Sequence, residues 1–112
     1  EMIRAMSPRP IIFALSNPTP EIMPEEALKA GAQVVATGRS DFDNQINNVL
    51  AFPGLFRAVV DGELTTISEE MKQAAVDAIT RAIPKPTSNK IVPNPFTSGL
   101  SDQVAKAVLS AR

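Results

Sequence analysis

The chain has 112 residues, of which 44% are hydrophobic, so it is long enough to form one small domain with a core. Its formal net charge is −1 with both signs interspersed, which argues against a nucleic-acid or anionic-membrane partner. Cysteine and histidine are absent, so a disulfide scaffold, a Cys-based zinc site and a histidine general base are excluded.

The first half of the chain predicts a βαβ unit. Residues 1–7 are typical of the tail of a helix, which the following prolines would stop. The continuous apolar runs IIFAL (11–15) and QVVAT (33–37) are typical of strands buried on both faces of a parallel sheet. Between them, Pro24 begins a short helix that Gly31 ends.

Two polar loops follow these predicted strands, at residues 16–20 and 38–44. Because the carboxyl ends of parallel strands meet at one edge of a sheet, both loops are expected where such sheets bind ligands.

The middle of the chain predicts helices. Residues 47–60 are apolar enough for a buried helix, which Pro53 and Gly54 would kink or restart. Thr66 and Glu69 have capping-box spacing, so we expect them to open a further helix that ends before the next prolines.

The end of the chain predicts an arm and a last helix. Residues 87–96 form an irregular arm, and Ser101 is expected to cap a helix over residues 102–111. The predicted division is therefore residues 1–83 as one body and residues 84–112 as a carboxyl-terminal arm and helix. Two strands do not make a stable sheet alone, so the pattern is typical of half of a larger α/β domain.

The stretch DFDNQINNVLAFPG, residues 41–54, sets several side-chain amides before an apolar segment. On the residues alone two interpretations stay open. Asn47 and Asn48 could cap the helix, and Asn17 could be an ordinary turn residue before Pro18. Alternatively, the amides could orient an anionic ligand, because an amide offers donors and acceptors without adding charge.

Three stretches carry a resemblance to a known family: FALSNPTPEI (13–22), VVATGRSDFDNQINNVLAFPGLFRA (34–58) and ISEEMKQAAVDAI (67–79). They resemble the carboxyl-terminal part of bacterial and archaeal malic enzymes. The resemblance implies an α/β fold, the second half of a doubly wound (Rossmann-like) parallel sheet that binds NAD(P), followed by carboxyl-terminal helices. It also implies oxidative decarboxylation of (S)-malate to pyruvate and CO2 with NAD or NADP and a divalent metal, Mg2+ or Mn2+.

The same resemblance implies roles for two residues. Asn17 would lie beside the nicotinamide ribose and the substrate, and Asn47 would hold a malate carboxylate. Asn48 would at most support them, and Arg39 is interpreted as half of an exposed loop pair with Asp41 rather than as a site residue. No catalytic or metal-binding residue is expected within this chain.

The isolated chain is expected to be inactive, because it has no tyrosine, no acidic cluster in a family metal motif and no glycine-rich phosphate loop. The expected partners are malate or pyruvate, the remainder of a malic enzyme chain, and further copies in a homo-oligomer. No nucleic-acid or membrane partner is expected, and a cytoplasmic location is predicted because no apolar run approaches the roughly 20 residues of a membrane span. The alternative is a non-catalytic half-domain that self-associates or binds a partner through its open sheet edge.

Overall fold

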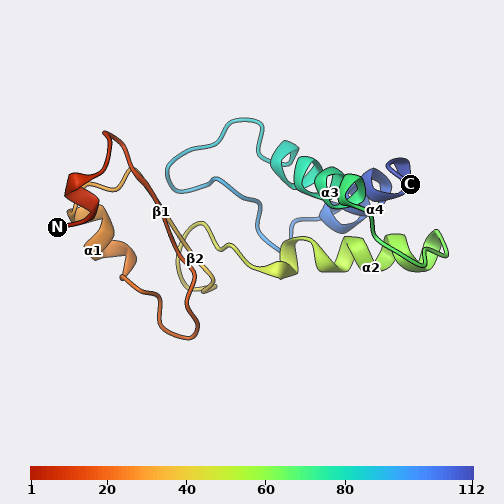
Figure 1. Cartoon of the computed structure of the whole chain (residues 1–112), viewed down its shortest axis with the longest axis horizontal. Coiled ribbons are helices and arrows are strands. Elements are labelled where there is room, and N and C mark those ends of the chain that lie inside the picture. Colours follow the sequence, from red (N-terminus) through yellow and green to blue (C-terminus); the bar gives the residue numbers. More distant parts are fainter. The chain divides into compact units, whose positions relative to one another are not determined.

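The computed structural model describes residues 1–112 and divides into two compact units (Figure 1). The first unit comprises Glu1–Asn47 and Pro86–Ile91, and the second comprises Asn48–Lys85 and Val92–Arg112. The short segment Pro86–Ile91 therefore belongs to the α/β unit, although it follows most of the helical unit in the sequence.

The first unit contains a short 3-10 helix η1 (Ile3–Ala5), strand β1 (Ile11–Ala14), helix α1 (Pro24–Lys29) and strand β2 (Val34–Thr37). Helix α1 begins at its proline, as predicted, because proline has no N–H to lose at the first helical position. Gly31 follows the end of the helix with φ of 109°, a conformation that a side chain would disfavour.

Strands β1 and β2 pair in parallel, with Ile11 opposite Val34 and Ala14 opposite Thr37. The fold class is α/β and the βαβ prediction is confirmed. Burial on both faces is correct for β2, which is buried throughout, but wrong for β1. Ile11 and Phe13 are 59% and 52% exposed, because they lie on the face of β1 opposite to Ile12, which packs against the core.

The core of the first unit lies between α1 and the sheet. Ala27, Ala32 and Val35 are buried there, and three larger side chains pack against them: Ile3, Ile12 and Ile22. The small size of the alanines allows α1 to pack closely against β2.

The second unit is helical: η2 (Asn48–Leu50), α2 (Phe52–Asp61), α3 (Glu69–Arg81) and α4 (Leu100–Ser110). The predicted helix over residues 47–60 divides into η2 and α2, and α2 restarts the helical path at Phe52 with Pro53 in its first turn, as predicted. The reason is that proline is compatible with the first turn of a helix and not with its interior.

Two predicted caps are wrong. Ser68, not Thr66, caps α3, where its Oγ accepts a hydrogen bond from the Met71 N–H at 3.3 Å. Helix α4 begins at Leu100 after Gly99, which has φ of 78°, so Ser101 lies within the helix rather than at its cap. A glycine in the left-handed region turns the chain into the helix one step earlier than the serine would.

The core of the second unit joins all of its α-helices. Its buried residues are Leu50, Ala58, Met71, Ala75, Ala78, Leu100, Val104, Ala105 and Val108. Helices α2 and α4 touch at Gly54, where an added Cβ would lie 2.5 Å from the Cβ of Val104. In neither unit is a helix long and apolar enough to cross a membrane.

Candidate functional site

An open cavity lies where the two parallel strands end, entirely within the first unit. Its volume is about 490 Å3. The lining residues come from the loop after β1 and the loop after β2: Asn17, Pro18, Gly38, Arg39, Ser40, Asp41, Gln45 and Asn47. Both predicted site residues, Asn17 and Asn47, therefore line the same cavity. The cavity also lies at the sheet edge where a ligand was expected from the strand order.

The loop after β1 is closed by a carboxylate. Glu21 accepts two hydrogen bonds from Ser16, at 3.2 Å from the backbone N–H and at 2.6 Å from Oγ. The hydroxyl bond, together with nearby backbone N–H groups, lowers the pKa of Glu21 because these donors favour the ionised form. Asn17 lies inside this closed loop, and its peptide bond to Pro18 is cis.

The amide of Asn17 packs against the backbone of the second loop. A Cβ added to Gly38 would lie 3.2 Å from Asn17 Oδ1 and 3.3 Å from Nδ2. Because these distances are shorter than an ordinary van der Waals contact, a side chain at position 38 would require the Asn17 amide to shift slightly. Gly38 thus joins the two loops that line the cavity.

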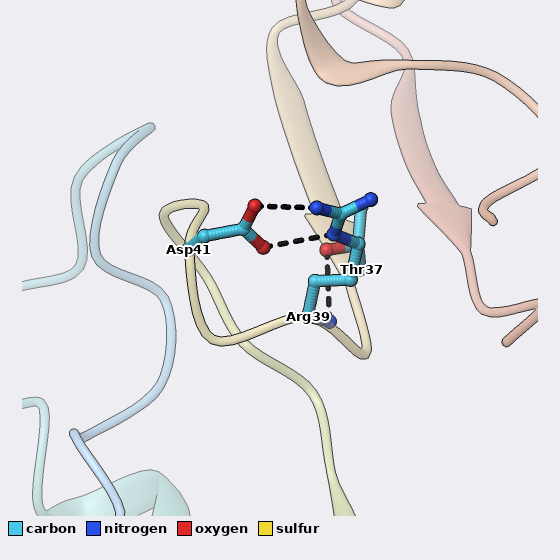
Figure 2. A network of polar contacts seen from close by, with 3 residues as sticks. All are labelled: Thr37, Arg39 and Asp41. Carbon is cyan, nitrogen blue, oxygen red and sulfur yellow. Dashed lines mark hydrogen bonds and ion pairs between the residues drawn. The ribbon is translucent and has the colours of Figure 1, made fainter. Parts of the chain in front are cut away.

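The loop after β2 begins with a bidentate ion pair between Arg39 and Asp41, which Figure 2 shows. Arg39 donates to both carboxylate oxygens of Asp41, from Nε at 2.8 Å and from Nη2 at 2.6 Å, and its backbone N–H donates to Thr37 Oγ1 at 3.2 Å. The side-chain hydrogen bonds between Arg39 and Asp41 raise the pKa of Arg39 and lower the pKa of Asp41. The guanidinium also lies 5.2 Å from the centre of the Phe42 ring.

The pairing of Arg39 with Asp41 was predicted, but both residues line the cavity, which the sequence interpretation had not assigned to them. The signal that could have found them is position, because they directly follow a buried strand at the ligand edge. Their mutual pairing leaves the cavity with one neutralised carboxylate and several neutral amides.

The loop then returns alongside β2. Gln45 forms an isolated parallel bridge with Thr37, and the Ile46 N–H donates to the Thr37 carbonyl at 2.8 Å. The Gln45 side chain reaches the Gly38 carbonyl at 3.4 Å. This return carries Asn47 to the same cavity as Asn17, at the end of the first unit.

Asn44 has a different task from its neighbours, because it is 7% exposed and lines no part of this cavity. Its Nδ2 donates to the carbonyls of Val35 and Ser88, at 3.1 and 2.7 Å, and its Oδ1 accepts from the Ile91 N–H at 2.9 Å. The amide thereby joins β2 to the segment Pro86–Ile91. Of the amides in the stretch 41–54, Asn44 is thus a structural residue.

The amide side chains in the cavity lining are better suited to hydrogen-bond an anion than to bind a metal ion. No group of three or more histidine, cysteine, aspartate or glutamate side chains in the chain could hold a metal ion. Divalent magnesium and manganese prefer oxygen ligands from carboxylates, and the one carboxylate in the lining is engaged by Arg39.

Comparison with known proteins identifies the family. Residues 1–111 match the family model described as the NAD-binding domain of malic enzyme. The chain belongs to the malic enzyme family. The resemblance carried by the SNPTP and NQINNV stretches is therefore confirmed.

Curated malic enzymes from bacteria match almost the whole chain. The bifunctional malic/malolactic enzyme of Bacillus subtilis is 54% identical over 99% of this chain, which spans 28% of that protein. The NAD-dependent malic enzyme of Geobacillus stearothermophilus is 46% identical, and this chain spans 23% of it. An NADP-dependent malic enzyme of Rhizobium meliloti is 41% identical, so relatives of both cofactor preferences match. The chain thus spans about a quarter of the length of the Bacillus subtilis and Geobacillus stearothermophilus enzymes.

Solved malic enzyme structures share the fold. The malic enzyme of Pyrococcus horikoshii is 47% identical with a TM-score of 0.91, over 96% of this chain and 25% of that one. The NAD-dependent malic enzyme of Thermotoga maritima is 45% identical with a TM-score of 0.93, over 98% of this chain and 29% of that one. The Rossmann-like assignment is consistent with these longer malic enzyme structures, which contain this arrangement.

Proposed function

We propose that this chain is part of a malic enzyme that oxidises and decarboxylates (S)-malate to pyruvate and CO2 with NAD or NADP. Within that enzyme, Asn17 contacts the substrate on its nicotinamide side and Asn47 binds a malate carboxylate. The observation that carries this proposal is that two amides from separate loops line one cavity at the carboxyl ends of the parallel strands.

The chemistry of the cavity supports a dianionic substrate. Malate carries two carboxylates, so a free carboxylate in the lining would repel it, whereas an amide donates hydrogen bonds without charge. Asp41 is held by Arg39 and adds little net charge. Asn17 can also accept a hydrogen bond, which suits a position between an anionic substrate and a ribose hydroxyl.

The divalent metal of the reaction would be held by parts of the enzyme outside these residues, because this chain offers no metal-binding cluster. When bound, such a metal supplies electrostatic stabilisation of negative charge on the reacting carbonyl. The residues here would bind and orient malate, and the proposal assigns no proton transfer to them. We further propose a cytoplasmic homo-oligomer.

The proposal is tested by alanine variants of the two amides in the full-length enzyme. Replacing Asn47 removes a hydrogen bond from a neutral amide to a charged carboxylate. Such a bond is worth about 1.5–3 kcal/mol, so kcat/KM for malate should fall about 10- to 150-fold. Asn89→Ala is the control, because Asn89 is an exposed amide of the same unit that does not line the cavity. Unchanged kinetics for Asn47→Ala would refute the assignment.

A second candidate rests on the exposed side of β1. Ile11 and Phe13 of β1 are 59% and 52% exposed, and Leu15 just after the strand is 45% exposed, on a strand with one neighbour, which favours pairing with another polypeptide. If the native polypeptide in its source cells has the mass of this chain and sediments as an oligomer, this non-catalytic reading replaces the enzyme. A native mass several times larger supports the malic enzyme.

A further inference from the structure

We propose that Glu21 is a positioning residue, which closes the loop after β1 and thereby holds the Asn17 amide in place at the cavity. The inference rests on the proposed function, since it explains how one of the two proposed substrate-binding amides is fixed.

The geometry of the closure brackets Asn17 in sequence. Both carboxylate oxygens of Glu21 accept hydrogen bonds from Ser16, the residue immediately before Asn17. The intervening residues include Pro18 and Pro20, whose rings fix their φ angles near −65°. A loop with closed ends and two fixed torsions leaves the Asn17 backbone little freedom.

Asn17 is also restricted by its contact with Gly38. The amide of Asn17 would lie only 3.2 Å from a Cβ at that position, so it already packs against the backbone of the opposite loop. The closed loop restricts the Asn17 backbone, and the amide lies against Gly38 on the opposite loop. A hydrogen bond weakens steeply with misalignment, so a small movement of this amide reduces its contact with a substrate.

A merely structural role for Glu21 makes a different prediction. The carboxylate is exposed, and exposed polar pairs contribute little to stability. On that reading, removing the charge would leave malate kinetics unchanged. The lowered pKa of Glu21 agrees with an engaged carboxylate that is ionised at neutral pH.

The test is a double-mutant cycle in the full-length enzyme, with the kinetics of malate as the readout. Glu21→Gln keeps the shape of the side chain but turns one acceptor into a donor facing Ser16, so KM for malate should rise about three- to tenfold. Glu25→Gln is the matched control, because Glu25 is an exposed glutamate in the first turn of α1, outside the cavity. Its kinetics should match those of the unmodified enzyme.

The hydroxyl of Ser16 gives an independent arm. Ser16→Ala removes the 2.6 Å bond and should also raise KM, whereas Ser16→Thr retains the hydroxyl and should restore values near those of the unmodified enzyme. The thermal midpoint of every variant is measured alongside, so that a loss of folded protein is not read as a loss of binding.

The two proposals fail in different ways. If Glu21 acts through Asn17, Glu21→Gln adds no further increase in KM once Asn17 is alanine, because the positioned group is gone. Equal effects in both backgrounds, or no effect of Glu21→Gln where Asn17→Ala has one, overturn the positioning role alone. If Asn17→Ala itself leaves KM and kcat unchanged, the proposed function of Asn17 fails and the role of Glu21 fails with it.

Discussion

Replacing Asn44 should release the segment Pro86–Ile91 from the first unit. This amide makes three hydrogen bonds, two as a donor at 2.7 and 3.1 Å and one as an acceptor at 2.9 Å. Two of its three partners, Ser88 and Ile91, lie in that segment, and the third, Val35, lies in β2. Asn44→Ala removes all three bonds at once.

The magnitude follows from those bonds. Two of the three bonds join the segment, so at about 0.5–1.5 kcal/mol each their loss should cost about 1–3 kcal/mol for attachment of the segment. Asn44 has φ of 56°, which alanine tolerates poorly, so Asn44→Gly should cost about 1 kcal/mol less than Asn44→Ala. Since 1.4 kcal/mol is a factor of ten, an amide of the segment that this attachment protects should exchange with solvent about 5- to 140-fold faster in the alanine variant.

Native-state hydrogen exchange measures this directly. The informative amide is that of Ile91, because it donates to Asn44 Oδ1, whereas the amides of Thr87 and Lys90 bond within the segment and report whether its own turn persists. Asn48→Ala is the control and should leave all three rates unchanged. The reasoning is refuted if Asn44→Ala accelerates the Ile91 amide no more than the control does.

Two further changes test the helical unit. Gly54→Ala should lower the free energy of unfolding by about 1–2 kcal/mol in urea, because overpacking against Val104 at 2.5 Å outweighs the roughly 1 kcal/mol that alanine adds to helix propensity. An unchanged or higher midpoint would contradict the close contact of α2 with α4. Ser68→Ala should cost about 1 kcal/mol through loss of its bond to the Met71 N–H, while Ser68→Thr should cost less; equal losses for the two variants would argue against the cap.

Much of the α/β unit could be predicted from local chemistry. The apolar runs at residues 11–15 and 33–37 lie close to β1 and β2, and Pro24 and Gly31 mark the ends of α1. These features depend on side-chain volume and on backbone torsions within a few residues, so they are readable without the fold. The family was likewise readable, because its amide and proline motifs are contiguous in sequence.

The helix boundaries were less predictable, because they depend on packing between elements. Thr66 and Ser68 are both acceptable cap residues, and the choice between them depends on which turn buries Met71 in the core. Helix α2 starts at Phe52 rather than at residue 47, after the separate 3-10 helix η2. Such choices are made by packing, which sequence spacing does not encode.

The element types, the parallel pairing and the edge at which a ligand would bind follow from the sequence. The fold adds the separate role of Asn44, which is buried and hydrogen-bonds to Ser88 and Ile91, apart from Asn17 and Asn47 in the cavity lining. The physical reason is that neighbouring amides have the same chemistry, and the partners that distinguish them lie as far as 47 positions away in the chain.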